Sequence, residues 1–166
     1  MGQGGLGVGV GVLLLFSTWL AIVQLRSLGP LTLLAFFALA WVADIAAYFA
    51  GRRFGRHKLA PSISPGKTRE GAIGAVLGVV MYGVLLRPGS PFETIPLWQW
   101  VLLLVGLTAI SIIGDLYESL LKRQAGIKDS SQILPGHGGV LDRIDSLTST
   151  MPVIAFLTIL LLTPGV

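Results

Sequence analysis

Long apolar stretches separated by short charged clusters dominate the chain. Four of these stretches carry no charge and a fifth is interrupted by a single aspartate: residues 1–25, 71–86, 94–114, 146–166 and, with Asp44, 27–51. A helix that crosses the hydrocarbon core of a bilayer needs about 20 mostly apolar residues. We therefore predict five membrane-spanning helices, at Leu6–Leu25, Pro30–Ala50, Gly71–Leu86, Ile95–Asp115 and Thr148–Pro164.

Helices are the regular structure that this pattern supports. Polar and apolar residues do not alternate in the way a strand requires, and in lipid a helix satisfies its own backbone hydrogen bonds. The composition agrees, because 53% of the 166 residues are apolar and 12% are charged, against about 25% charged in a typical soluble domain. The prediction is an all-α, polytopic integral membrane protein with about five transmembrane helices, in which residues 1–166 form a single membrane-embedded domain. The absence of cysteine excludes a disulfide scaffold, a thiolate metal site and a cysteine nucleophile.

Basic residues are concentrated in two of the connections between the predicted spans. Ten of the twelve lie in residues 51–71 or 114–146, whereas the opposite connections hold Arg26 and Arg87. Lysine and arginine are enriched in cytoplasmic connections. We therefore expect a multi-pass protein of the cell inner (plasma) membrane, with the N-terminus and both basic connections in the cytoplasm and the C-terminus outside. Nucleic-acid binding is not expected, because the basic segments flank membrane spans and lack interleaved aromatic residues.

The first basic connection, residues 51–71, combines charge with rigidity. Its glycines and prolines indicate a structured loop rather than a continued helix. One interpretation is a basic anchor that contacts anionic lipid headgroups. However, Ser62, Ser64 and Thr68 add hydroxyl donors beside the lysines and arginines, and Asp44 lies about two turns before the loop. Such a loop is suited to holding phosphate oxygens with fixed donors.

The second basic connection, residues 114–146, carries two pairs of acidic residues. Asp115 and Glu118 are three residues apart, hence on one helix face. Asp142 and Asp145 repeat that spacing just before the last span. If the two helix ends pack together, the carboxylates converge, and such oxygen ligands suit a hard divalent cation such as Mg²⁺. The alternative is a set of salt bridges with the neighbouring Lys122, Arg123 and Arg143.

Two further features stand out by their position. The run Pro-Gly-His-Gly-Gly at 135–139 allows the main chain to approach a ligand closely, although a simple turn is the alternative and the ending of a Walker loop is missing. Within it, His137 is expected to donate to a phosphate or to make a structural hydrogen bond rather than to bind a metal. Asp44 is an ionisable residue inside an apolar span, which marks a functional site. It could help to bind a cation, orient a basic side chain, relay a proton, or pair structurally with an arginine.

Together, the two connections resemble a known family, the phosphatidate cytidylyltransferases, also called CDP-diacylglycerol synthases. The second is similar to the family's signature at Ser119, Lys122, Arg123, Lys128, Asp129, Pro135, Gly136, His137, Gly138, Gly139, Asp142, Arg143 and Asp145. The first is similar to the family's preceding loop at Asp44, Ala47, Tyr48, Gly51, Arg52, Lys58, Leu59, Ser64, Pro65, Lys67, Thr68, Glu70 and Gly71. The resemblance covers residues 41–147. Because members of the family are usually longer, we expect the chain to correspond to their C-terminal catalytic portion.

The resemblance implies transfer of CMP from CTP to phosphatidic acid, which gives CDP-diacylglycerol and pyrophosphate in phospholipid biosynthesis. It implies Mg²⁺ as cofactor, held by Asp115, Asp142, Asp145 and Asp44. The phosphates would be neutralised by the catalytic residues Lys122, Arg123, Lys128 and Arg143. The nucleotide would meet the turn formed by Gly136, His137, Gly138 and Gly139. The lipid phosphate would meet the 51–70 loop, through Arg52, Lys58, Ser64, Lys67 and Thr68. A second cation and a homodimer are left open.

Other interpretations remain at this stage. A relative that uses CTP on another membrane lipid, such as an archaeal ether lipid or a polyprenol, would share the glycine-histidine run. An ion or proton transporter built around Asp44 would carry ionisable residues in several spans, but here acids and bases gather at one face of the membrane. A non-catalytic fragment or subunit would be expected to have lost the acidic positions, and these are retained.

Overall fold

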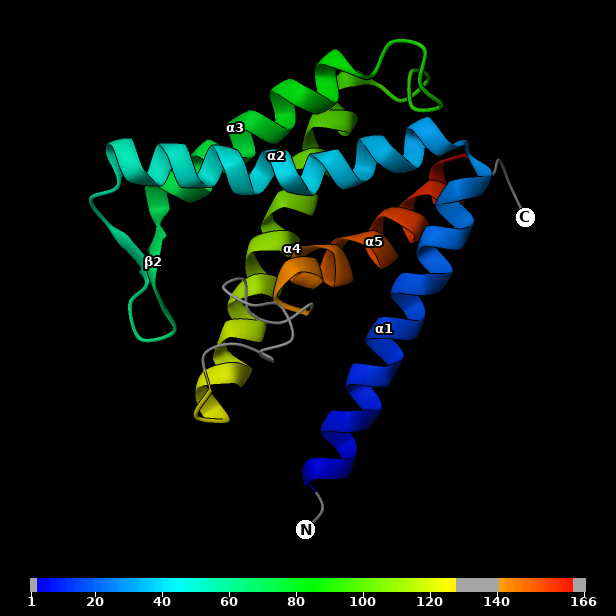
Figure 1. Ribbon diagram of the computed structural model, residues 1–166. Coiled ribbons are helices and arrows are strands. Elements are labelled where there is room, and N and C mark those ends of the chain that lie inside the picture. Colours follow the sequence, from blue (N-terminus) through cyan, green and yellow to red (C-terminus); the bar gives the residue numbers. More distant parts are fainter. Residues whose placement is uncertain (1–2, 128–140, 163–166) are drawn as a thin grey trace.

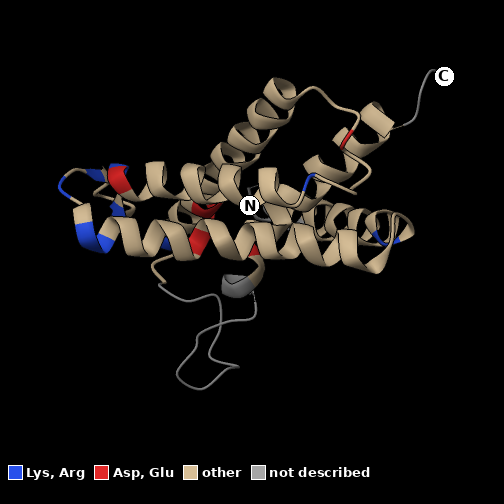
Figure 2. Cartoon of the chain, turned by 90° about the horizontal axis from the view of Figure 1, so that it is seen from above, with Lys and Arg blue, Asp and Glu red and all other residues tan. Residues whose placement is uncertain are grey.

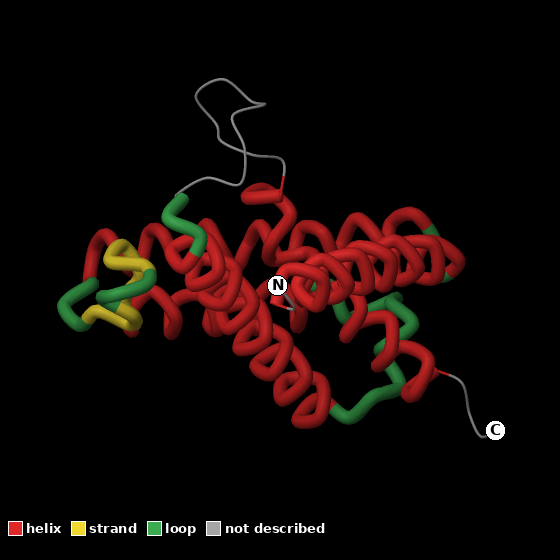
Figure 3. The backbone as a smooth tube through the Cα atoms, turned by 90° about the horizontal axis from the view of Figure 1, so that it is seen from below, coloured by secondary structure: helices red, strands yellow, loops and turns green. Residues whose placement is uncertain are grey.

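The computed structural model describes residues 3–127 and 141–162 of the chain (Figure 1). The elements in chain order are α1 (Gln3–Ser27), α2 (Pro30–Phe54), β1 (Lys58–Ala60), β2 (Ser64–Thr68), α3 (Arg69–Leu85), α4 (Leu97–Gln124) and α5 (Leu141–Leu162). Helices form most of the described chain, and a short hairpin lies at one end of it (Figure 3). The prediction of an all-α polytopic membrane protein is confirmed. Within the described residues, α1, α2, α4 and α5 are long and apolar enough to cross a bilayer.

Several predicted boundaries were wrong. The fourth helix does not end at Asp115 but continues to Gln124, and the fifth begins at Leu141 rather than Thr148. The predicted ends were placed where the first charged residues appear. A helix can nevertheless continue past that point into the polar interface, because long basic side chains reach water there. The third helix forms as expected but has 17 residues, fewer than the other four helices.

The first basic connection also differs from its prediction as a loop. α2 continues into it as far as Phe54, and its remainder is a two-stranded antiparallel hairpin. Lys58 pairs with Thr68 and Ala60 with Ser64, with an irregular register between the two pairs. Pro61 lies in the turn of this hairpin, and Pro65 is compatible with β2 because an isolated pair of strands leaves one side of each strand free of ladder hydrogen bonds.

Helices α2 and α3 form the most extensive contact between elements of the described chain. Small residues make it possible: a methyl group at Gly74 would overlap the Cβ of Ala50, and one at Gly78 would lie 2.7 Å from the Cβ of Ala46. Close approach of this kind is typical of membrane helices, where packing and backbone contact replace the hydrophobic drive of water. The contact therefore fixes how the hairpin between the two helices is presented.

Buried side chains connect the remaining helices. Leu25, Leu104 and Met151, from α1, α4 and α5, are fully buried, and the indole of Trp100 stacks on Phe92 with ring centroids 5.1 Å apart. The buried hydroxyl of Thr108 donates to the carbonyl of Leu104 at 2.8 Å, which satisfies a polar group that would be costly in an apolar interior. Large apolar side chains are exposed on every one of the five helices, as expected for a surface that faces lipid.

Charged residues are distributed unevenly over the fold. Figure 2 shows most lysines and arginines of the described chain at the end that carries the hairpin, and few at the other end. The C-terminal end of α2, the N-terminal end of α3 and the C-terminal half of α4 meet on this side. The polar chemistry of the described chain is therefore collected at one end of the helix assembly.

We expect Gly74→Ala to lower the free energy of unfolding by about 1–3 kcal/mol, because the added methyl group overpacks the contact between α2 and α3. Denaturation with SDS in mixed micelles, followed by circular dichroism, measures this. Gly106→Ala is the matched control, since nothing lies within 4 Å of a Cβ at Gly106. The control should be neutral or stabilising by up to about 1 kcal/mol, the helix preference of alanine over glycine. Equal effects at both positions would contradict the packing argument.

Candidate active site

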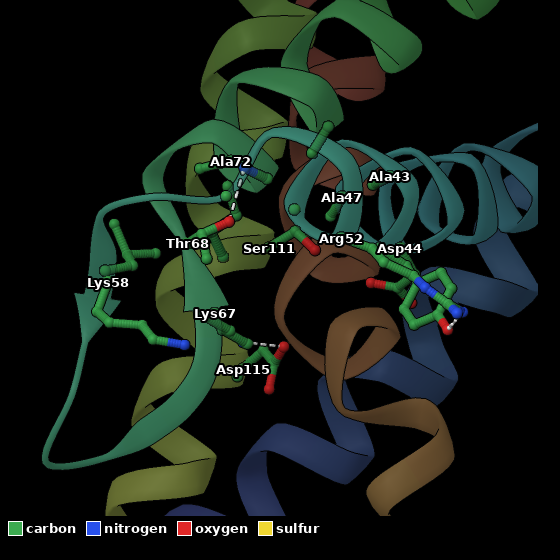
Figure 4. Close-up of a pocket in the computed structure, with 18 residues that line it drawn as sticks. Ala43, Asp44, Ala47, Arg52, Lys58, Lys67, Thr68, Ala72, Ser111 and Asp115 are labelled. Atoms are coloured by element: carbon green, nitrogen blue, oxygen red, sulfur yellow. Dashed lines mark hydrogen bonds and ion pairs between the residues drawn. The ribbon is translucent and has the colours of Figure 1, made fainter.

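A cavity of about 400 Å³ lies between α2, the hairpin, the start of α3 and the second half of α4 (Figure 4). Its polar lining consists of Asp44, Tyr48, Arg52, Lys58, Lys67, Thr68, Ser111 and Asp115. Most of the remaining lining is glycine and alanine. Because these residues have small side chains, polar groups from four elements can surround one space.

The hairpin carries two lysines to this cavity. Lys58 and Lys67 lie on β1 and β2, and Figure 4 shows both extending toward the cavity. The base of the hairpin is closed by main-chain bonds, including the amide of Arg69 donating to the carbonyl of His57 at 2.9 Å. The strands thus hold two long and otherwise mobile cations in place.

Glu70 fastens the hairpin to the start of α3. Its carboxylate lies 2.7 Å from Nδ1 of His57 and accepts from the main-chain amide of His57 at 3.2 and 3.3 Å. The hydrogen bond from the His57 ring, together with main-chain amides, lowers the pKa of Glu70 from 4.5 to about 2. Glu70 therefore stays ionised at all physiological pH values, beside the positive end of the helix dipole.

Thr68 ends β2 and begins α3. Its hydroxyl oxygen accepts from the amide of Gly71 at 3.1 Å and so caps the helix. Gly51 and Gly71 face each other here, and a Cβ at Gly71 would lie 2.9 Å from the carbonyl oxygen of Ala47. Glycine thus brings the N-terminus of α3 against the last turns of α2, at the wall of the cavity. A helix N-terminus with free amides favours anions.

Asp115 lies at the centre of the charged groups. Lys67 forms an ion pair with it (Figure 4). The carboxylates of Asp44 and Asp145 are each near enough to interact electrostatically with its charge. Glu118, one turn further along α4, pairs with Lys122 at 3.2 Å. Acids and bases are thus intermixed, as a site for a phosphate and its counter-ion requires.

A complete metal site is not formed by the described residues alone. No three acidic or histidine side chains among them come together closely enough to hold an ion. Asp44, for which the sequence left open a pairing with an arginine, has no ion pair or hydrogen bond within the described chain. The donor chemistry of the carboxylates nonetheless suits a hard cation.

The predicted site residues separate into three groups. Those that line the cavity are Asp44, Arg52, Lys58, Lys67, Thr68 and Asp115. Those described elsewhere are Ser64, Lys122, Arg123 and Asp145, of which Arg123 donates through Nε to the carbonyl of Ile63 at 3.4 Å. Those that lie outside the described residues, or whose side chains do, are Lys128, Gly136, His137, Gly138, Gly139, Asp142 and Arg143. The structure brings the first group together and leaves the third as predictions.

Two polar residues of the cavity were not among the predicted site residues. Ser111 lies on α4 one turn before Asp115, and Tyr48 lies on α2 one turn after Asp44. The spacing of four residues places each on the same helix face as its aspartate. That spacing is the signal in the sequence that could have identified Ser111. Tyr48 had been named from the sequence as a position of the family resemblance, without a role in the site.

The fold and the cavity define a class: a multi-pass membrane protein with a polar, mixed-charge site at one end of its helices. The comparison with known families makes this specific. The sequence profile of the cytidylyltransferase family matches residues 6–161, and the chain belongs to that family.

The chain is similar to bacterial proteins that are named phosphatidate cytidylyltransferase. A phosphatidate cytidylyltransferase of Pseudomonas aeruginosa is 48% identical over 153 residues, which are 90% of this chain and 56% of that protein. The phosphatidate cytidylyltransferase of Haemophilus influenzae is 47% identical over 131 residues, 77% of this chain and 46% of that protein. That of Staphylococcus saprophyticus is 40% identical over 152 residues, covering 92% and 55%. The chain thus spans about half the length of these curated relatives.

The link between Glu70 and His57 predicts a pH dependence of stability. The pKa of Glu70 is lowered in the folded chain, so its contribution is fully present above 4.5 and is lost as the pH falls toward about 2. We expect the difference in unfolding temperature between the unmodified chain and Glu70→Gln to be constant above that range and to shrink within it. Glu93→Gln, at the opposite end of the molecule, controls for the change in net charge. A gap that stays constant throughout would rule out the link.

Proposed function

We propose that the chain carries the machinery that transfers CMP from CTP to phosphatidic acid, giving CDP-diacylglycerol and pyrophosphate. Membership of the cytidylyltransferase family and the names of the similar proteins support this. The observation that carries the proposal is the cavity in which Asp115 and Lys67 form an ion pair beside one further acid, Asp44, and two further bases, Arg52 and Lys58. It lies at the end of apolar helices, where a lipid headgroup and a water-soluble nucleotide can meet.

The reaction requires the protein to stabilise negative charge on the phosphates more than it requires a strong general base. A phosphate oxygen of the lipid bonds to the α-phosphorus of CTP, and the bond from that phosphorus to the bridging oxygen breaks, so that pyrophosphate leaves. The lipid phosphate is already an anion at neutral pH, so no residue needs to remove a proton from a weak acid. The catalytic problem is to position two polyanions and to stabilise charge on the leaving group.

Side chains of the cavity can meet this demand. Lys58 and Lys67 present ammonium groups from the hairpin, and the capped N-terminus of α3 presents main-chain amides. Release of Lys67 from Asp115 would free one cation for a phosphate and one carboxylate for a counter-ion. The ion pair thus keeps both groups in position in the absence of substrate.

We also propose Mg²⁺ as the cofactor, held by Asp115 and Asp145 with Asp142 and Asp44. Carboxylate oxygens are ligands that this ion prefers, and the proximity of Asp115 to Asp44 and to Asp145 supports the assignment. The ion would neutralise charge on the triphosphate. The side chain of Asp142 lies outside the described residues, and the described acids do not form a three-ligand site by themselves.

The proposed location is the inner membrane, with the cavity on the cytoplasmic side. The concentration of basic residues at the end that carries the hairpin supports this orientation (Figure 2). In this orientation, CTP would reach the cavity from the water of the cytoplasm.

Asp115→Asn should lower the rate of CDP-diacylglycerol formation at least about 100-fold, because it removes the central charge of the site. The assay uses the purified chain in detergent with labelled CTP and phosphatidate, with and without Mg²⁺. Asp142→Asn should behave likewise. Glu93→Gln, a similar change on the far side of the fold, should retain full activity. Mg²⁺ affinity, measured by isothermal titration without substrate, should fall in both Asp variants. Undiminished turnover in Asp115→Asn would contradict the assignment.

The orientation is testable by cysteine labelling, since the chain contains no cysteine. Ser62→Cys places a thiol at the exposed turn of the hairpin, and Thr94→Cys places one in the exposed connection between α3 and α4. In intact spheroplasts, a membrane-impermeant maleimide should label Thr94→Cys and should label Ser62→Cys only after permeabilisation. The reverse pattern would overturn the cytoplasmic placement.

A further inference from the structure

One face of α2 forms a continuous stripe that leads to the cavity. Trp41, Ile45 and Tyr48 are 58%, 56% and 58% exposed, and Arg52 follows in the last turn of the helix. The spacings of four, three and four residues place these side chains on one helix face. The stripe is apolar along the helix, and it ends in a phenol and a guanidinium.

Tyr48 holds the guanidinium of Arg52. Nη1 of Arg52 donates to the phenolic oxygen of Tyr48 at 2.9 Å, and the guanidinium carbon lies 5.9 Å from the ring centroid. Both side chains line the cavity. Figure 4 shows Arg52 beside Asp44, on the side of the cavity away from Lys58. An arginine that is exposed and would otherwise be mobile is thereby fixed where the apolar stripe meets the cavity.

The two substrates of the proposed reaction reach the cavity from different phases. A nucleotide arrives from water, whereas a lipid phosphate is attached to acyl chains that stay in the bilayer. Lys58 and Lys67 belong to the hairpin, beyond the end of α2, but Arg52 is part of a membrane-spanning helix. The cation nearest to the acyl chains is therefore the one placed for the lipid. Arginine also suits a phosphomonoester because its planar fork can make two parallel hydrogen bonds.

We propose that Tyr48 is a positioning residue that holds Arg52 for the phosphate of the lipid substrate, with an acyl chain lying along Trp41 and Ile45. This inference rests on the proposed function and assigns one side of the cavity to the lipid. Tyrosine is suited to the role because its ring is compatible with lipid and its hydroxyl with the polar interface.

Arg53 provides an internal comparison. It has the same charge, is also exposed, and lies over an aromatic ring, with its guanidinium carbon 6.0 Å from the centroid of Phe54. It does not line the cavity. A general attraction of anionic lipid to basic residues would involve both arginines, whereas a specific site involves only Arg52.

The first test separates the Michaelis constants of the two substrates. Tyr48→Phe removes the hydrogen bond but keeps the ring, and should raise the apparent KM for phosphatidate about three- to tenfold. Arg52→Ala should raise it at least about tenfold, and adding Tyr48→Phe to it should change nothing further, because the two act as one unit. In each case kcat and the KM for CTP should stay the same. Arg53→Ala should leave all three constants unchanged.

Other kinetic outcomes overturn the inference. A loss of stability without a selective change in the KM for phosphatidate would make Tyr48 merely structural. An equal rise in the KM for CTP would assign the guanidinium to the nucleotide. A Tyr48→Phe effect that persists in Arg52→Ala would show that Tyr48 does not act through the arginine.

The second test does not require turnover and so separates this inference from the proposed function. Trp41 lies 11 residues before Arg52, or about 16 Å along the helix, at the depth of the lower acyl chain. The fluorescence of Trp41 is obtained by subtracting the emission of the Trp41→Phe variant from the emission of the unmodified chain. Phosphatidate brominated in the lower half of its acyl chains should quench it more than equally brominated phosphatidylcholine in vesicles of the same lipid content. The excess should vanish in Arg52→Ala, fall in Tyr48→Phe and persist in Arg53→Ala. Equal quenching by both lipids would overturn the inference even if the chain is active, and an excess would support it even if no product forms.

Discussion

The close contact between α2 and α3 is the constraint on which the rest of the site depends. The hairpin that carries Lys58 and Lys67 has three residues in one strand and five in the other, and a pair of strands this short is not stable by itself. It is held because both of its ends continue into helices whose backbones approach each other through glycine at 51 and 71. A larger residue at this crossing would separate the helices and move the lysines away from Asp115.

Charge balance in the cavity follows from its place at the edge of the apolar helices. An acidic group within an apolar span is costly unless charge or water compensates it. Asp115 is compensated by Lys67, and Glu118 by Lys122. Asp44 and Asp145 lie near Asp115, and neither forms an ion pair within the described chain. These two carboxylates, together with Asp115, are therefore the groups that could hold the counter-ion of the proposed reaction.

Much of the site could be inferred from residue types and helical spacing. The apolar stretches identified the helices, the position of the basic residues identified the end that carries the chemistry, and Asp44, Arg52, Lys67 and Asp115 indeed line one cavity. The hairpin could not be read from the sequence, because its strands are too short to show alternation and they contain glycine and proline. The pairing of Lys67 with Asp115, 48 residues apart, also had no signal in the local pattern.

The sequence by itself determined the class of protein, since hydropathy over about 20 residues decides whether a helix lies in lipid, and charge decides which ends of the helices meet water. It also determined which residues can bind phosphate, because that depends on side-chain chemistry. Only the tertiary structure decided which of them act together. In the folded chain, Arg123 donates to a carbonyl of the hairpin turn and does not line the cavity. Thr68 caps α3, and Tyr48 accepts a hydrogen bond from Arg52. These outcomes depend on how closely the helices pack, and packing is a property of the folded chain rather than of any one segment.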